Sequence, residues 1–134
     1  MQVGKLGLVM IVVSNMDRSV AFYRDVLGLK LLFHQSNWSQ FDAGHMLIGL
    51  HPEGDEVKVS PTSGFSLGIY VDDITKACSE LKRRHGHLAI EPRNEPFGRW
   101  ALLKDPDGYG VQLVELKSGY REQHKLEEPV TAAQ

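Results

Sequence analysis

Gln112 is a polar residue in a stretch where packing alone would place apolar side chains. It follows the turn sequence Asp105-Pro106-Asp107-Gly108 and lies in a predicted strand, Val111–Leu116, on a face that is otherwise apolar or small. A side-chain amide both donates and accepts hydrogen bonds, so it can hold a polar group of a bound molecule. Gln112 is therefore the first candidate site residue.

The six histidines are the other side chains with obvious chemistry. His45 and His51 fall on one face of a predicted strand, but roughly 20 Å of extended chain separates them, which is too far for a shared ion. His34, His51 and Gln112 form a conceivable metal set if the fold brings them together. The alternative is that these histidines are solvated or hydrogen-bonded groups at strand ends. Without a metal, His51 is the candidate general base.

The elements that must position these side chains are predicted from turn residues and hydrophobic periodicity. The order strand, helix, strand, strand, strand occurs twice, in residues 6–52 and 65–116. Gly28 and Gly86 end the two helices, and Pro106-Asp107-Gly108 predicts a tight hairpin in which the aspartate bonds its own backbone and the glycine takes a positive φ. The predicted strands are Leu6–Val13, Leu29–Gln35, Trp38–Ala43, His45–His51, Phe65–Val71, Leu88–Glu91, Arg99–Leu103 and Val111–Leu116, with helices at Arg18–Val26 and Lys76–His85 and a proline-rich loop after Glu91.

The two halves also match residue by residue. Asn15 and Gly28 align with Asp73 and Gly86 at one constant offset. A duplicated module that cannot cover its own sheet face implies that the halves pair, within one chain or across two. We therefore predict an α+β fold in which two βαβββ modules, residues 6–52 and 65–116, make a single domain over residues 1–117. A polar C-terminal tail, residues 118–134, follows.

Composition narrows the class of protein. The chain has 134 residues, a net charge of -2, 42% hydrophobic residues and 24% charged residues, so it makes no electrostatic match to nucleic acid or an anionic membrane. The apolar run Leu6–Val13 is too short to span a bilayer. Cys78 is the sole cysteine, which excludes an intrachain disulfide and favours a reducing, cytoplasmic setting.

Three features together resemble the vicinal oxygen chelate superfamily, the group of glyoxalase I, bleomycin-resistance proteins and extradiol dioxygenases. They are the stretch VSNMDRSVAFYRDVLGL at residues 13–29, the stretch DPDGY at residues 105–109, and the duplicated βαβββ pattern. The resemblance covers about residues 6–115. It implies a U-shaped mixed β-sheet that encloses a cavity, with the helices on the outer face. One scaffold of this kind hosts several chemistries, so the function needs separate evidence.

The resemblance also implies where a metal would be held. The metalloenzymes of this superfamily chelate a divalent metal with four ligands, usually His, Glu or Gln, one from each key strand. Those positions fall on Leu8, Gly49, Ser66 and Gln112. Leucine and glycine side chains carry no lone pair, and a serine hydroxyl with one amide is a poor set for a catalytic divalent metal. We therefore expect no metal and no other cofactor, as in the bleomycin-resistance branch.

If these four positions face the cavity, the period of two along a strand predicts the rest of its wall. A concave and mainly apolar wall with a few polar groups is typical of a small-molecule site. Trp38 and Trp100 lie on neighbouring strands and could stack on a planar ligand, or could equally belong to the core or an interface. The candidate ligand-binding residues are Leu8, Met10, Trp38, Leu47, Gly49, His51, Ser66, Tyr70, Trp100 and Gln112.

These observations favour a metal-free homodimer that sequesters an aromatic or amphipathic compound such as an antibiotic. The alternative is an enzyme, a glyoxalase-like lyase or isomerase or a dioxygenase, with a non-standard metal set drawn from His34, His51 and Gln112. A third reading is a structural or regulatory protein whose cavity is filled by its own side chains.

Overall fold

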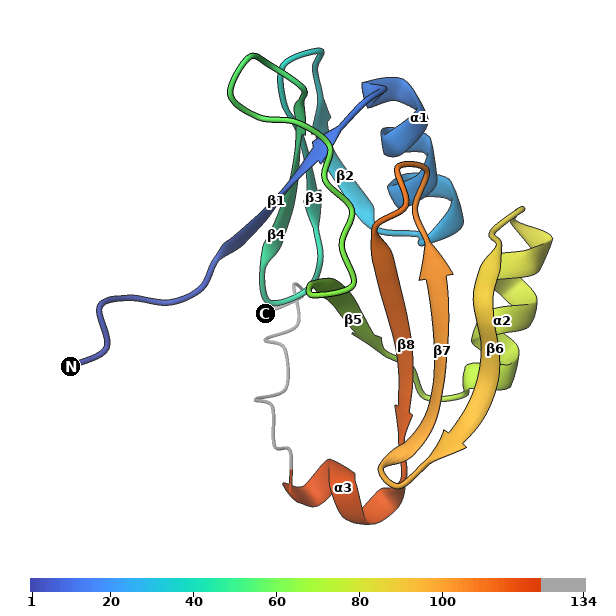
Figure 1. Cartoon of the computed structure of the whole chain (residues 1–134). Helices are drawn as coiled ribbons and strands as arrows, with labels where there is room; N and C mark the ends of the chain where they lie inside the picture. The colour runs from blue at the N-terminus through green and yellow to red at the C-terminus, as the bar shows by residue number, and fades with distance from the viewer. Residues whose placement is uncertain (124–134) are drawn as a thin grey trace. The chain divides into compact units, whose positions relative to one another are not determined.

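The computed structural model describes residues 1–123 of the chain (Figure 1). Within this range the chain divides into two compact units, residues 1–60 and residues 61–123. Each unit holds one four-stranded sheet with its own helix. The predicted α+β class and its two βαβββ modules are therefore confirmed, with one module in each unit.

The first unit contains the mixed sheet predicted for residues 6–52. Its elements are β1 (Leu8–Val13), α1 (Met16–Ala21), η1 (Phe22–Val26), β2 (Lys30–His34), β3 (Ser39–Asp42) and β4 (Leu47–Pro52). The strands lie in the order β1-β4-β3-β2, with β1 parallel to β4 and the other pairs antiparallel. The helix predicted at Arg18–Val26 is thus present, but it changes from α to π winding at Phe22.

The second unit repeats this plan. Its elements are β5 (Ser66–Tyr70), α2 (Ile74–Arg83), β6 (Leu88–Glu95), β7 (Gly98–Lys104), β8 (Gly110–Leu116) and α3 (Ser118–Gln123). The order is β5-β8-β7-β6, with β5 parallel to β8. The register repeats too, because Leu8 pairs with Leu47 as Ser66 pairs with Gly110. Leu8 and Ser66 therefore occupy equivalent positions in the two modules.

Both helices begin with the same capping interaction. The side chain of Asn15 accepts a hydrogen bond from the Arg18 amide at 3.0 Å, and that of Asp73 accepts one from the Lys76 amide at 3.1 Å. Each cap residue is extended, at φ -146° and -141°, and each satisfies an amide that has no partner within its helix. The alignment of Asn15 with Asp73 in the sequence thus reflects one local structure built twice.

Each sheet has one face against its helix and one face without it. In the first unit, Val20 and Tyr23 of the helix are buried with Phe41 and Leu50 of the sheet, and the Tyr23 and Phe41 rings lie 6.0 Å apart. In the second unit the buried set is Ile74, Cys78, Leu81, Ala101, Leu103, Val111 and Leu113. Because strand side chains alternate, the residues between these point to the other face. We call it the open face: Leu8, Met10, Leu47, Gly49 and His51 in the first sheet, and Ser66, Gly68, Tyr70, Gln112 and Val114 in the second.

The hairpin between β7 and β8 forms where the sequence predicts it, and Asp105 contributes to it through its carboxylate. Gly108 has φ 93°, as a Pro-Asp-Gly turn requires. The carboxylate of Asp105 accepts hydrogen bonds from the amides of Asp107 and Tyr109, both at 2.9 Å. Asp105 is 5% exposed, so a nearly buried carboxylate that the sequence analysis did not single out helps to hold the turn.

Two local predictions in the second unit were wrong. The segment after Glu91 is not a loop, since β6 continues to Glu95; Pro92 is tolerated because β6 is an edge strand that does not need every amide for the ladder. Helix α2 ends at Arg83 and not at His85, and His85 adopts the left-handed conformation after it, at φ 68°. The described part of the predicted tail begins with α3, and residues 124–134 lie outside the described range. Among the described residues, no helix has the length and apolar character needed to cross a membrane.

Candidate functional site

Three predicted site residues of the second unit form one hydrogen-bonded chain across its open face. Trp100 Nε1 donates to Gln112 Oε1 at 2.6 Å, and Gln112 Nε2 donates to Ser66 Oγ at 2.6 Å. The three residues come from β7, β8 and β5, and all are half-buried. An indole N–H can only donate, so it fixes the amide of Gln112 with its oxygen toward Trp100.

This chain leaves hydrogen-bond donors available to a ligand. Gln112 Nε2 has a second hydrogen, and the hydroxyl of Ser66, which accepts from Gln112, keeps its own hydrogen to donate. Arg93 lies over the Trp100 ring with Cζ 4.6 Å from the centroid, and its Nε is 2.9 Å from Glu95 Oε1. The open face of the second sheet therefore presents donors and an aromatic ring that a cation already contacts.

The remaining predicted residue of this face, Tyr70, is 55% exposed at the end of β5. Gly68, between Ser66 and Tyr70 on the same face, is also exposed, and a Cβ added there would meet no atom within 4 Å. The face is thus uncovered along β5 within the described residues.

In the first unit, Trp38 lies directly on the backbone of Gly49. A Cβ added at Gly49 would overlap the six-membered ring of the indole, so no other residue can stand there while Trp38 keeps its position. Trp38 Nε1 donates to Gln40 Oε1 at 2.9 Å, which holds the ring in this orientation. The absence of a side chain at Gly49 therefore leaves the space that the Trp38 ring occupies.

The two tryptophans occupy equivalent places in their modules. Gln40 lies opposite Gly49 in the first sheet as Leu102 lies opposite Gln112 in the second. Trp38 and Trp100 each precede those residues by two positions. Both tryptophans were predicted from the sequence as site residues, but their equivalence was not. Their partners Gln40 and Arg93 were also missed, because strand pairing determines which neighbours meet. The spacing Trp38-x-Gln40, which puts both residues on one strand face, could have predicted the first of these contacts.

The rest of the first open face is apolar, with His51 at its end. Leu8 and Met10 are 42% and 45% exposed, and Leu47 is half-buried beside them. His51 Nδ1 lies 2.6 Å from the Pro52 carbonyl oxygen. The rings of His51 and Trp38 meet edge to face, with centroids 6.4 Å apart at 74°. All six predicted ligand-binding residues of the first unit thus gather on one face of its sheet.

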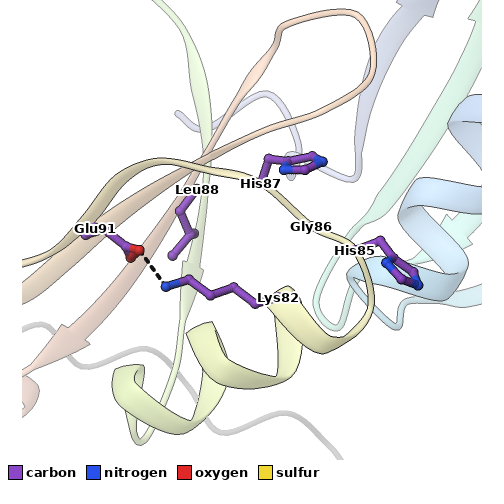
Figure 2. A pocket seen from close by; sticks show the side chains of 6 residues that line it. All are labelled: Lys82, His85, Gly86, His87, Leu88 and Glu91. Atoms are coloured by element: carbon purple, nitrogen blue, oxygen red, sulfur yellow. Dashed lines mark hydrogen bonds and ion pairs between the residues drawn. The ribbon is translucent and has the colours of Figure 1, made fainter.

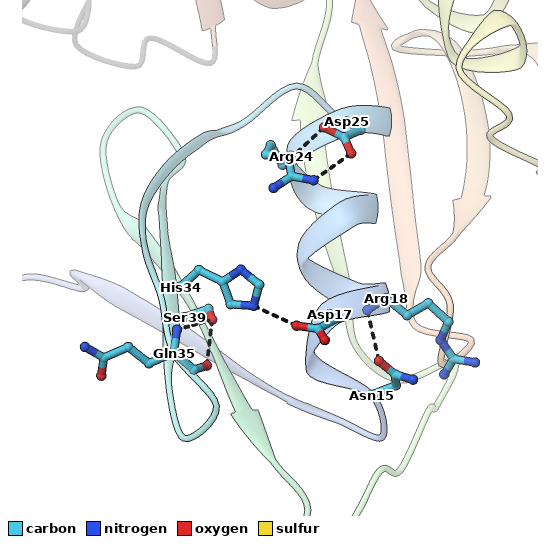
Figure 3. A network of polar contacts seen from close by, with 8 residues as sticks. All are labelled: Asn15, Asp17, Arg18, Arg24, Asp25, His34, Gln35 and Ser39. Carbon is cyan, nitrogen blue, oxygen red and sulfur yellow. Dashed lines mark hydrogen bonds and ion pairs between the residues drawn. The ribbon is translucent and has the colours of Figure 1, made fainter.

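His34 does not join them. It pairs with Ser39, which pairs with the buried Leu50, so it points to the helix face, and His51 points to the opposite one. There His34 Nε2 lies 2.9 Å from Asp17 Oδ1 at the start of α1, and the contact ties β2 to that helix (Figure 3). His34 and His51 therefore lie on opposite faces of one sheet, so His34 does not join His51 in the metal set considered with Gln112.

The donor set does not suit the metal that the resemblance implies. Leu8 and Gly49 have no donor atom, and Gln112 already uses both ends of its amide on Trp100 and Ser66. Among residues 1–123, no three His, Cys, Asp or Glu side chains come together as a possible ion site.

A shallow hollow of about 430 Å³ lies elsewhere in the second unit, between the end of α2 and the start of β6 (Figure 2). Lys82 and Glu91 form an ion pair across it, and both side chains are more than half exposed. An exposed pair of this kind leaves no unsatisfied group aimed at a ligand. Its lining residues are Lys82, His85, Gly86, His87, Leu88 and Glu91, none of which the sequence predicts as a site residue.

Comparisons with known proteins match both the sequence and the fold. A family model described as Glyoxalase/Bleomycin resistance protein/Dioxygenase superfamily matches residues 5–113. A lactoylglutathione lyase of Neisseria meningitidis serogroup A is 30% identical over 127 residues, which cover 82% of this chain and 89% of that protein. One from Salmonella typhimurium is 29% identical over 126 residues, covering 84% and 93%.

Among solved structures, TnmS3, an antibiotic binding protein from Streptomyces sp. CB03234, superposes with a TM-score of 0.74 at 24% identity. The match covers 87% of this chain and 99% of that chain. At this level of identity the likeness establishes a shared fold.

Proposed function

The chain belongs to the Glyoxalase/Bleomycin resistance protein/Dioxygenase superfamily, and from that premise we propose that it binds and sequesters a small aromatic or amphipathic molecule without a metal ion. The open face of each sheet, taken by itself, is a surface suited to holding it. Specificity then comes from shape, from stacking on an indole and from a few hydrogen bonds, with no covalent step required.

The observation that carries this proposal is the Trp38 ring seated on Gly49. Gly49 is a position where the superfamily's metalloenzymes place a ligand, and here an indole held by Gln40 covers it. A large flat ring at that point replaces a metal ligand with an apolar surface suited to an aromatic molecule. The described fold neighbour, an antibiotic binding protein, is consistent with this use of the scaffold.

The open face of the second sheet carries polar groups suited to a ligand. The free hydrogens of Gln112 Nε2 and Ser66 Oγ are donors, so they suit a carbonyl or another acceptor on the ligand. Leu8, Met10 and Leu47 supply apolar surface on the first face, and Tyr70 supplies an aromatic ring on the second. In the proposed form the protein is a homodimer, which sedimentation equilibrium of the purified full chain tests.

The experiment that tests the proposal combines metal analysis with a ligand screen. Elemental analysis of natively purified protein should find no stoichiometric divalent metal, and added Ni²⁺, Zn²⁺ or Mg²⁺ should leave the melting temperature unchanged. A panel of planar aromatic compounds and antibiotics should contain members that raise the melting temperature, through mass action on the folded state. Trp38→Ala should weaken the binding of those compounds. Gly68→Ala serves as the matched control, since it changes an open-face residue that does not contact the Trp38 ring.

One observation favours an enzyme instead, namely that the matched curated relatives are lactoylglutathione lyases. A stoichiometric metal, a metal-dependent rise in melting temperature and lactoylglutathione lyase activity would together overturn the metal-free proposal. If the protein contains no metal and no compound of the panel raises its melting temperature, a structural or regulatory role is favoured.

A further inference from the structure

We propose that His51 selects ligands that carry a hydroxyl donor at the edge of an aromatic ring, with that ring stacked on Trp38. This inference rests on the proposed function and names the chemical class of its ligand, a phenol or an enol. It is carried by the fixed orientation of one imidazole on a sheet face whose other side chains are mainly apolar.

The hydrogen bond to the backbone decides which nitrogen of His51 carries the proton. A carbonyl oxygen can only accept, so His51 Nδ1, 2.6 Å from the Pro52 oxygen, must be the donor. In the neutral imidazole the other nitrogen, Nε2, is then an acceptor with a free lone pair. Among the described residues, Nε2 of His51 has no hydrogen-bond partner.

The same bond determines where that lone pair lies. Nδ1 is next to the atom that attaches the ring to the side chain, and here it is turned back to the strand. Nε2 is at the far end of the ring, so it lies away from the backbone on the side of the open face. A half-buried acceptor of this kind, with Leu47 and Gly49 preceding it at alternate positions, is a polar point on an apolar surface.

The neighbouring indole defines what reaches Nε2. Trp38 lies against the strand at Gly49, and the His51 ring stands beside it at 74°. A second flat ring stacked on the outer side of the indole would meet the standing imidazole with its edge, where ring substituents lie in plane. A hydroxyl there can donate to Nε2, whereas an ether or a plain C–H cannot. A ligand that offers only an acceptor at this edge would face a lone pair.

A matched pair of probes tests this inference. The two compounds 2-naphthol and 2-methoxynaphthalene share one planar ring system, but only the first has a hydroxyl donor. We expect the full-length protein to bind 2-naphthol about tenfold more tightly by isothermal titration calorimetry in mildly alkaline buffer, the difference that one half-buried hydrogen bond supplies. His51→Phe keeps a flat ring and removes the acceptor, so it should bring the ratio of the two affinities to about one.

The outcomes separate this inference from the proposed function. Equal binding of both probes by the wild-type protein, or an unchanged preference in His51→Phe, would overturn the role of His51 and leave aromatic binding intact. Binding of neither probe would overturn both. His51→Gln, which restores a neutral acceptor, should recover part of the preference if His51→Phe folds with a lowered melting temperature.

A second measurement needs no variant. Long-range ¹H–¹⁵N correlation spectra of the wild-type protein report which imidazole nitrogen is protonated. A neutral His51 with the proton on Nδ1 is expected, and a neutral ring with the proton on Nε2 would overturn the inference.

Discussion

Replacing Gly49 with alanine directly tests the packing of the Trp38 ring against the backbone of Gly49. Gly49 and Gly68 both lie on open faces within strands, and neither has a positive φ, so both backbones accept alanine without strain. At Gly68 the new Cβ meets nothing within 4 Å, whereas at Gly49 it overlaps the Trp38 ring. Gly49 is buried on the inner strand β4 and Gly68 is exposed on the edge strand β5, and only at Gly49 does the new methyl group collide with an indole.

The magnitude follows from two opposing contributions to the free energy of unfolding. Glycine to alanine in an unstrained strand stabilises by about 0.5–1 kcal/mol, because the unfolded chain loses freedom. Insertion of a methyl group into an occupied space costs about 1–3 kcal/mol. Gly68→Ala should thus be neutral or stabilising, and Gly49→Ala should be less stable than Gly68→Ala by about 1–3 kcal/mol.

Urea unfolding followed by far-UV circular dichroism measures both values. Trp38 and Trp100 are the two tryptophans of the chain, so in a Trp100→Phe background the fluorescence reports on Trp38 alone. Gly49→Ala should shift that emission to longer wavelength as the ring leaves the strand, while Gly68→Ala leaves it in place.

The decisive comparison is a double-mutant cycle with Trp38→Ala. Once the indole is gone, Gly49→Ala should behave as Gly68→Ala does, since the new Cβ has space. If Gly49→Ala has the same cost with and without the indole, the ring does not rest on Gly49 and the reasoning for a metal-free site loses its main support.

Three further predictions concern the second unit. Gln112→Met should lower the free energy of unfolding by about 1–2 kcal/mol in urea titrations, because it breaks the hydrogen bonds to Trp100 and Ser66. Gln112→Glu should lose less stability, since its carboxylate can accept from both residues. Equal losses for the two variants would contradict the hydrogen-bonded series Trp100–Gln112–Ser66. Asp105→Ala should cost about 1–3 kcal/mol by the same measurement, since two amides lose a nearly buried carboxylate, and an unchanged free energy of unfolding would contradict this role. Burial raises the pKa of the Cys78 thiol, so fewer thiolates form at a given pH and iodoacetamide should react only as the protein unfolds; rapid alkylation of native protein would refute this.

The elements of the fold could be predicted because local signals agreed with one another. Asn15 and Asp73 cap their helices where the repeat places them, and Gly28 takes its left-handed conformation at φ 76°. The left-handed conformation of His85 was not predicted, because glycine is the usual residue in that conformation and Gly86 follows directly. The strand from Glu91 to Glu95 was missed because a proline normally interrupts pairing, except at the edge of a sheet.

The sheet face on which each candidate residue lies could be predicted, but the contacts among these residues could not. Alternation along strands correctly puts Gln112 and Ser66 on one face, and the same reasoning puts His51 with Gly49. That Trp100 and Ser66 occupy the amide of Gln112, and that Trp38 covers Gly49, depends on contacts between strands whose register the sequence does not state. The grouping of His34 with His51 failed for the same reason, since their strands are separated by β3 and a bulge in β2 interrupts the pairing.

The parallel pairing of the first and last strand in each module has a consequence for synthesis of the chain. β1 is entirely apolar in sequence, and its strand partner in the described sheet is β4, the last strand of its module. A ribosome therefore releases β1 long before its partner exists, and the intervening chain must fold back to close a non-local contact. During that interval the strand is an unpaired apolar edge, the kind of segment on which nascent chains aggregate or recruit chaperones. Slow elongation before residue 52 would lengthen the exposure, so the yield of folded protein is coupled to the rate at which β4 emerges.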